Sequence, residues 1–134
     1  MKLLLSAALL LSFAIPATAQ DAARGEKEFN KCKSCHSITT PEGETIVRGG
    51  KTGPDLHGVI GRTAGSTDFR YGASMKSLAD KGVVWSEDEL VVFLSNPKEW
   101  LVTQTGDSGA KTTMTFKLVK GGADVAAYLA SVAQ

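Results

Sequence analysis

The only two cysteines of this chain, Cys32 and Cys35, lie in the segment KCKSCHS, and His36 follows the second of them directly. Four kinds of site use cysteines at this spacing: a disulfide, a redox-active dithiol, half of a zinc site, and an attachment site for haem. A thioredoxin-like dithiol lies near a βαβ pattern, and zinc needs about four ligands. The choice among the four therefore depends on what the rest of the chain offers.

The first 19 residues have the order of a secretory signal. Lys2 precedes an apolar run over residues 3–15, and Pro16 and the small residues Ala17-Thr18-Ala19 follow it. A membrane anchor is the alternative, but the run is shorter than the roughly 20 apolar residues that span a bilayer, and the proline closes it. We expect cleavage after Ala19. The product, residues 20–134, would then be a periplasmic protein without a membrane span.

The charge balance argues against one class of function, nucleic-acid binding. Loss of Lys2 with the signal leaves 14 basic residues against 14 acidic residues, a formal net charge of zero. A chain without an excess of positive charge is not expected to bind nucleic acid. The remaining 115 residues suffice for one compact domain with one core, which we expect to be monomeric.

Helical patterns dominate residues 20–134. Asp21 can cap a first helix that runs through Phe29 to Cys32. A short helix is expected at Ser74–Asp80, with Gly82 as its end. A last helix is expected over Ala123–Val132, with one apolar face formed by Val125, Leu129 and Val132.

The clearest helix signal follows Trp85. Ser86 and Glu89 have the spacing of a capping box, and Trp85 and Leu90 have that of a hydrophobic staple. An apolar stripe of Leu90, Phe93 and Leu94 continues the helix until Asn96-Pro97 ends it. No segment shows sustained period-two alternation, so the predicted fold class is all-α.

Two long segments, Ser37–Arg62 and Leu101–Phe116, show no pattern of regular structure. Connections of this length are unusual in a compact domain unless they wrap something. Three or four short helices also supply little core of their own. A large apolar cofactor would provide the missing core.

Haem attachment is the use of the cysteines that agrees with these observations. C-x-x-C followed directly by His is the attachment signature of c-type haem, in which two thiols bond to the porphyrin and the imidazole reaches the iron. No βαβ pattern is present, and His57 is the only obvious fourth ligand for zinc. A disulfide remains the alternative in an exported protein. We expect one covalently attached haem c, held by Cys32 and Cys35, with His36 as an axial ligand.

The other axial position has three candidates in residues 20–134, which are His57, Met75 and Met114. Met114 lies in KTTMTF, between a polar loop and the last helix, where the backbone could cross the haem face. Met75 lies in the short helix near Leu78, which favours a role in the core. His57, in DLHG, is more typical of a hydrogen-bonded structural histidine.

The arrangement of these segments resembles the class I cytochromes c, and most closely the bacterial cytochromes c2. The resemblance covers essentially all of residues 20–134. It is carried, in this order, by the blocks GEKEFNKCKSCH, KTGPDLHGVIGRTAG, FRYG, VVW, FLSNPKEW, KTTMTFKL and DVAAYLASV. It implies a helical wrap around one haem, with one haem edge exposed and Met114 as the sixth iron ligand.

The resemblance also implies roles for single residues. The carbonyl of Pro54 would accept the Nδ1 proton of His36 and fix that ring. Gly25 would permit a close crossing of the first and last helices near Tyr128. Four further residues would contact the haem propionates through a charge, an N–H or a hydroxyl: Arg62, Tyr71, Trp85 and Thr112.

The sequence departs from the family pattern at three places. Phe93 stands where relatives have a tyrosine, so a buried hydroxyl near the methionine sulfur is missing. Extra residues occur in Thr39–Gly50, and the connection Leu101–Ala110 is long. These departures bear on loop conformation and on the choice of partner.

The expected function follows from the iron. With His and Met on its two axial positions the iron has no open site for a substrate, so its natural chemistry is one-electron transfer. We therefore expect an electron carrier and not an enzyme. By the resemblance, its donor is a cytochrome bc1-type complex and its acceptor is a photosynthetic reaction centre or a terminal oxidase. A haem enzyme or gas-binding protein with a labile sixth ligand is the alternative.

Docking on such membrane complexes would use lysines around the exposed haem edge. Lys31 and Lys33 flank Cys32, Lys111 and Lys117 flank Met114, and Lys51 and Lys120 would extend the face. The alternative is a scatter of solubilising lysines. An uneven charge distribution can steer encounter even in a neutral molecule.

Overall fold

The computed structural model describes residues 21–134. The predicted signal, residues 1–19, and its cleavage site after Ala19 lie outside the described residues. In chain order the elements are α1 (Ala22–Glu28), the 3₁₀ helix η1 (Phe29–Lys31), β1 (Ile38–Thr39), β2 (Thr45–Val47), α2 (Ala73–Lys81), α3 (Glu87–Ser95), α4 (Pro97–Thr105) and α5 (Gly122–Ser131). Apart from the short hairpin, the regular structure in this part of the chain is helical, as the sequence predicts.

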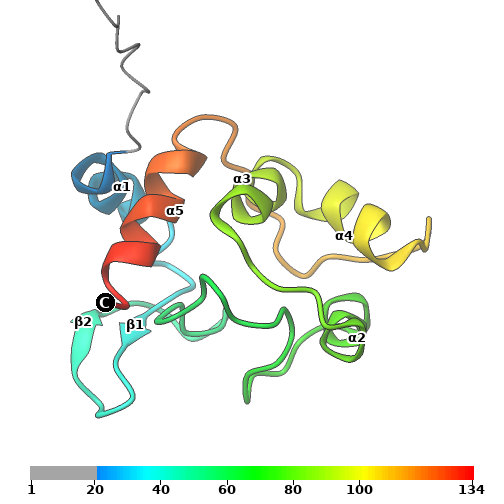
Figure 1. The fold of residues 1–134 in the computed structure, drawn as a ribbon, viewed down its shortest axis with the longest axis horizontal. Helices are drawn as coiled ribbons and strands as arrows, with labels where there is room; N and C mark the ends of the chain where they lie inside the picture. Colours follow the sequence, from blue (N-terminus) through cyan, green and yellow to red (C-terminus); the bar gives the residue numbers. More distant parts are fainter. Residues whose placement is uncertain (1–20) are drawn as a thin grey trace, which may run out of the picture.

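The helices contact one another in the spatial order α1, α5, α3, α4 and α2 (Figure 1). Helix α1 packs against α5, and α5 also contacts α3. Helix α4 contacts α3 on one side and α2 on the other. The hairpin lies beside the C-terminal end of α5, far from α2 in this view. None of the helices within residues 21–134 has the length and hydrophobicity that crossing a bilayer would require.

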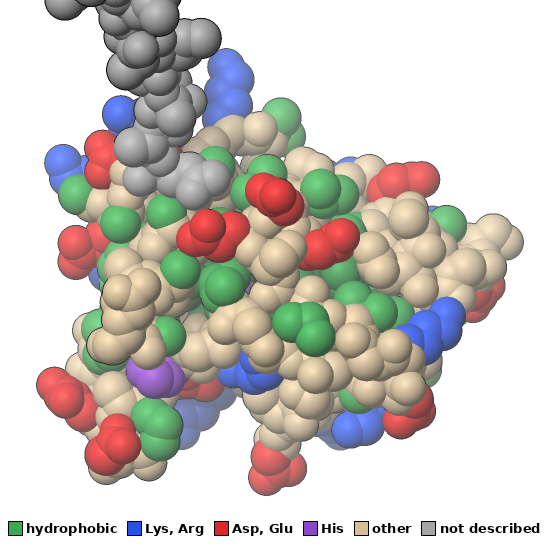
Figure 2. Space-filling model, in the orientation of Figure 1, with side chains coloured by type: hydrophobic (Ala, Val, Ile, Leu, Met, Phe, Trp, Pro, Cys, Tyr) green, Lys and Arg blue, Asp and Glu red, His purple; other side chains and the backbone are tan. Residues whose placement is uncertain are grey.

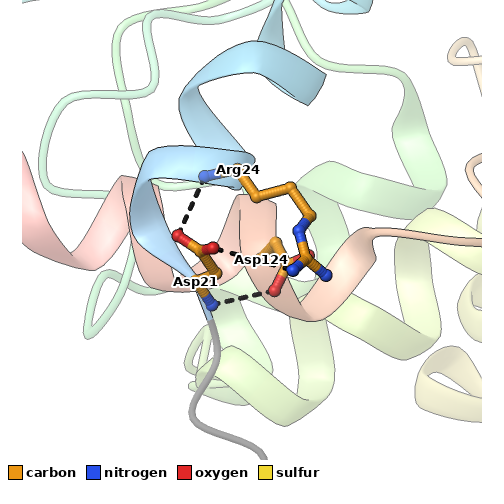
Figure 3. Close-up of polar contacts among 3 residues, drawn as sticks. All are labelled: Asp21, Arg24 and Asp124. Atoms are coloured by element: carbon orange, nitrogen blue, oxygen red, sulfur yellow. Dashed lines mark hydrogen bonds and ion pairs between the residues drawn. The ribbon is translucent and has the colours of Figure 1, made fainter.

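The first helix begins as predicted. The Asp21 carboxylate accepts a hydrogen bond from the Arg24 amide at 3.0 Å, which caps α1. The predicted helical run to Cys32 tightens into η1 after Glu28. The same end of α1 is tied to α5, because the Asp21 amide donates to Asp124 Oδ1 at 2.9 Å and the Arg24 guanidinium lies 3.6 Å from the Asp124 carboxylate (Figure 3).

The close crossing of the first and last helices is confirmed. A Cβ added to Gly25 would collide with the Asp124 carbonyl and would lie 2.8 Å from Tyr128 Cβ. Gly25 is buried in α1, and Tyr128 is 6% exposed and packs against Phe29. A glycine inside a helix costs roughly 1 kcal/mol relative to alanine, and here the close contact of two helices offsets that cost.

Helix α3 has half of its predicted capping box. Ser86 Oγ accepts a hydrogen bond from the Glu89 amide at 3.0 Å. The expected return bond from the Glu89 side chain is not made within the described residues. The Glu89 carboxylate instead accepts hydrogen bonds from Trp100 Nε1 and Gln104 Nε2 of α4. This carboxylate therefore joins two helices.

The prediction for Leu101–Phe116 is wrong in its first part, because Leu101–Thr105 belong to α4. Asn96-Pro97 does end α3, but Pro97 is also the first residue of α4. Proline suits that position, since the amide it lacks would have no partner inside the helix. The long connection expected over 101–110 is therefore partly helical and ends at Gly106, which is left-handed with φ +72°.

The other long segment, Ser37–Arg62, contains a small antiparallel hairpin. Ile38 pairs with Val47 and Thr39 pairs with Thr45, with a bulge between the two pairs. The predicted extra residues of Thr39–Gly50 form most of this hairpin.

The remaining helix predictions are correct to within one residue at each end. Gly82 ends α2 with φ +68°, and the predicted stripe of α3, Leu90, Phe93 and Leu94, is buried. On α5, Val125 and Leu129 are buried, and Val132 is half-buried just beyond the last residue of the helix.

Candidate haem site

One cavity brings the predicted site residues together. It is lined by all nine of them: Cys32, Cys35, His36, Pro54, Arg62, Tyr71, Trp85, Thr112 and Met114. Met75 also borders it from α2, whereas His57 is not among its lining residues. Of the three candidates for the sixth ligand, the two methionines therefore reach the cavity.

The attachment motif lies in a tight turn after η1. The amides of Cys35 and His36 both donate to the Cys32 carbonyl, at 3.1 and 3.0 Å. Both cysteines and the histidine of this turn border the same cavity. Both cysteines are free thiols, so the disulfide alternative has no support here.

The two thiols have different surroundings. Burial raises the pKa of the Cys32 thiol to about 11. Hydrogen bonds from Thr52 and Ser34 lower the pKa of the exposed Cys35 thiol. Within residues 21–134 no group of three or more His, Cys, Asp or Glu side chains converges in a way that could hold a metal ion. The zinc alternative is therefore unsupported.

The His36 ring is held as predicted. Its Nδ1 donates to the Pro54 carbonyl at 2.8 Å, which leaves Nε2 as the nitrogen available to a metal. Burial lowers the pKa of His36, and the bond to Pro54 and the charge of Asp55 partly oppose this shift. The neutral imidazole that a metal requires is thereby favoured.

The backbone at Gly53 comes very close to this ring. A Cβ added there would lie 2.7 Å from His36 Nδ1 and 2.8 Å from Nε2. Any side chain at position 53 would push the imidazole out of its place. The segment Gly53-Pro54 thus holds the ring by a hydrogen bond and by contact.

Met114 reaches the cavity from an irregular segment between α4 and α5. The Thr112 hydroxyl accepts from the Met114 amide at 3.1 Å and donates to the Met114 carbonyl at 2.9 Å. Because the only hydrogen of this hydroxyl is already donated, Thr112 could bond to a propionate only by giving up its bond to the Met114 carbonyl.

The other three predicted propionate contacts also line the cavity. The Arg62 guanidinium donates to the carbonyls of His57 and Asp55, at 3.0 and 3.1 Å, and desolvation lowers its pKa. The Tyr71 hydroxyl is 2.6 Å from Thr67 Oγ1. Trp85 is buried and stacks on Trp100, with ring centroids 4.5 Å apart.

Sequence reasoning did not assign the apolar walls of the cavity. They are formed by Phe29, Leu56, Val59, Leu90, Phe93, Leu94, Leu101, Val125 and Leu129. The helical stripes of α3 and α5 could have indicated five of these residues, because a stripe facing the core also faces whatever fills it. Leu101 could not be found without α4.

These residues fit a covalently attached haem. One cavity is bordered by two free thiols, by a thioether and by an imidazole whose Nδ1 is already hydrogen-bonded to Pro54. Its other walls are mostly aliphatic and aromatic. Thiol, imidazole and thioether are the groups that c-type haem uses, and an apolar wall suits a porphyrin.

Comparison with known proteins agrees with this chemistry, although no family model matches the chain. Cytochrome c-550 of Paracoccus versutus is 57% identical over 125 residues, 90% of this chain and 81% of that protein. Cytochrome c2 of Rhodobacter capsulatus is 53% identical over 135 residues, 98% of each chain. The solved structure of cytochrome c2 from Rhodobacter capsulatus superposes with a TM-score of 0.83 at 54% identity, over 85% of this chain and 99% of that one.

The chain belongs to the cytochrome c2 family. The resemblance expected from the sequence and the class I cytochrome c fold are both confirmed. Cytochromes c2 and c-550 are electron carriers with covalently bound haem and are not enzymes.

Within this cytochrome c2 fold, Phe93 lies in the apolar wall. It is 7% exposed, borders the cavity, and packs edge-on against Trp85 and Trp100, with ring centroids 5.1 and 5.3 Å away. The tyrosine that the family resemblance implies at this position would carry a hydroxyl in that wall, and Phe93 has none.

The six lysines of the expected docking face are all exposed. Lys31 and Lys111 border the cavity from the attachment turn and from the Met114 side. The Lys31 ammonium pairs with Glu28 at 2.6 Å, which offsets part of its charge. Figure 2 shows acidic side chains at the upper centre and around the edges of one face of the molecule, with basic side chains among them.

Proposed function

We propose that this protein is a periplasmic one-electron carrier whose haem is attached through Cys32 and Cys35 and ligated by His36 and Met114. The observation that carries the proposal is that the His36 ring, fixed by Pro54, and the Met114 side chain border one apolar cavity together with both free thiols. The family relationship supports the same function.

Bound haem would supply a one-electron Fe(III)/Fe(II) couple. The two thiols would hold it covalently, and His36 and Met114 would leave no axial position for a substrate. The apolar walls would exclude water, which favours the state of the iron with less charge. Arg62, Tyr71 and Trp85 border the cavity as donors suited to carboxylates, and we propose them as propionate contacts, with Thr112 as a conditional fourth.

We further propose that residues 1–19 are removed on export and that residues 20–134 work as a monomer in the periplasm. The donor would be a cytochrome bc1-type complex, and the acceptor a photosynthetic reaction centre or a terminal oxidase. The lysine face Lys31, Lys33, Lys51, Lys111, Lys117 and Lys120 would guide the encounter with both.

The test is spectroscopic and electrochemical. Haem-loaded protein in the oxidised state should show a low-spin spectrum with the weak near-infrared band of methionine–iron ligation. It should take up one electron reversibly in a potentiometric titration and exchange it with a bc1-type complex in membranes. A high-spin oxidised spectrum that changes on adding a small ligand would contradict the proposal and favour a haem enzyme or gas-binding protein.

A further inference from the structure

The segment that carries Met114 has unusually little backbone support. Within the described chain, residues 111–117 make no hydrogen bond between backbone groups. The neighbours on either side do, because the Ala110 amide donates to the Asp107 carbonyl at 3.0 Å and the Leu118 amide donates to the Leu94 carbonyl at 2.7 Å. The position of Met114 therefore depends on side chains.

Two hydroxyl groups bond to the backbone of this segment. The Thr112 hydroxyl bonds only to Met114, two residues away, so the pair can move together with the segment. Ser74 Oγ accepts a hydrogen bond from the Lys111 amide at 2.9 Å, across 37 residues of sequence. Ser74 lies in the first turn of α2, so its bond joins the segment to a helix.

The contact around Ser74 extends along the segment. A Cβ added to Gly72, just before α2, would lie 3.1 Å from the Thr113 methyl group, so residues 72–74 and 111–113 run side by side. Ser74 is half-buried, which limits the competition of water for its bond. Residues 111–117 are thus tied to α2 before Met114 and to α3, through Leu118, after it.

We propose that Ser74 is a positioning residue for the electron-transfer site, which holds the Met114 thioether in place through the Lys111 amide. This inference rests on the proposed role of Met114 as an iron ligand. Without the bond from Ser74, the segment would be held only at Leu118 and by packing, and it would open more often. Opening exposes the axial position to an external ligand.

The test compares Ser74→Ala with Ser77→Ala in haem-loaded protein. Ser77 lies in the same helix and donates to the Ser74 carbonyl at 2.9 Å, with no bond to residues 111–117, so it is a matched control. Two rates are measured: displacement of methionine from ferric iron by imidazole, followed by the near-infrared band, and hydrogen exchange of the Lys111 amide. Ser74→Thr, which keeps the hydroxyl, is the rescue variant.

Ser74→Ala should raise both rates about fivefold, the change that loss of one ordinary hydrogen bond produces. In Ser77→Ala and Ser74→Thr both rates should stay near those of the parent protein. Any change in global stability, measured by unfolding in denaturant, should account for little of the rate increase in Ser74→Ala. Equal rates in Ser74→Ala and Ser77→Ala, or a change that merely follows global stability, would overturn the inference. A parent protein whose band does not depend on Met114 would instead refute the ligand assignment, and the Lys111 exchange rate would still test the bond to Ser74.

Discussion

The two sides of the cavity hold the proposed iron ligands by different means. On the His36 side, the ring belongs to a backbone-bonded turn, its Nδ1 donates to Pro54, and Gly53 lies against it. On the Met114 side, the proposed ligand lies in residues 111–117, which make no hydrogen bond between backbone groups and are tied to α2 through Ser74.

This difference predicts which of the two proposed ligands should dissociate from the iron more easily. The imidazole is fixed by its own hydrogen bond and by contacts within about 20 residues of chain, which any folded state of this region retains. The thioether depends on contacts between segments distant in sequence, so a local opening can release it while the core stays folded. The predictions below test this asymmetry, from the largest expected effect to the smallest.

Removal of the proposed thioether ligand should have the largest effect. Met114→Ala should abolish the near-infrared band and lower the reduction potential by on the order of a few hundred millivolts, part of the roughly 0.8 V over which axial ligands set haem potentials. Met75→Ala is the control, since Met75 borders the same cavity from α2. A band that survives in Met114→Ala and disappears in Met75→Ala would reverse the assignment.

A methyl group on the His36 side should cost more stability than one on the Met114 side. Gly53→Ala places a Cβ against the imidazole. The ring cannot move away without breaking its hydrogen bond to the Pro54 carbonyl, and overpacking of this kind lowers the free energy of unfolding by roughly 1–3 kcal/mol. Gly72→Ala meets only a rotatable Thr113 methyl at 3.1 Å, so its cost should stay below about 1 kcal/mol. Denaturant unfolding of both haem-loaded variants measures the two free energies of unfolding. Equal losses of stability would contradict the proposed difference between the His36 and Met114 sides.

Neutralising lysines on the two sides of the cavity should slow electron transfer to a membrane partner. Lys33→Gln, Lys111→Gln and Lys117→Gln combined should reduce the second-order rate roughly tenfold at low ionic strength, with a nearly unchanged midpoint potential. The same change at Lys27, Lys76 and Lys98, which are exposed and are not part of the proposed lysine face, is the control.

The lysine effect should fade as salt is added. Equal slowing by the two triple variants, or a parent rate that does not depend on salt, would mean that these lysines serve solubility rather than docking.

A hydroxyl restored at position 93 should shift the potential modestly. In Phe93→Tyr, a hydrogen bond to the methionine sulfur would reduce its donation to ferric iron, raise the midpoint potential and let methionine be displaced at lower pH. If Phe93 only packs against Trp85 and Trp100, the new hydroxyl would be a buried polar group without a partner and would cost roughly 1–3 kcal/mol with no change in potential.

Phe29→Tyr is the matched control for that variant, because Phe29 is fully buried in the same cavity wall and packs on Tyr128. It should lose stability without a change in potential. Spectroelectrochemical titration of both variants distinguishes the two explanations, and an unchanged or lowered midpoint in Phe93→Tyr would contradict the sulfur hydrogen bond.

Local signals in the sequence predicted most of the helices. Asp21, Ser86 and Gly82 act within four residues of themselves, so their caps could be predicted directly and are present. Helix α4 was missed because Pro97 was interpreted as a stop, although proline both ends one helix and begins another. The side chain of Glu89 was predicted to bond within its own helix, and it bonds instead to two donors of α4, Trp100 and Gln104.

The sequence by itself determined the chemistry of attachment, because two thiols and an imidazole within five residues meet in almost any turn they can form. It also determined that the regular structure is mostly helical, because the caps and apolar stripes of the helices are local in sequence. Only the tertiary structure decided that nine predicted residues line one cavity, that His57 is absent from it, and that Ser74 holds the Met114 segment. Such contacts join residues up to 103 positions apart, as in the Asp21–Asp124 bond, and no local pattern encodes them, because they form only when the whole chain has packed.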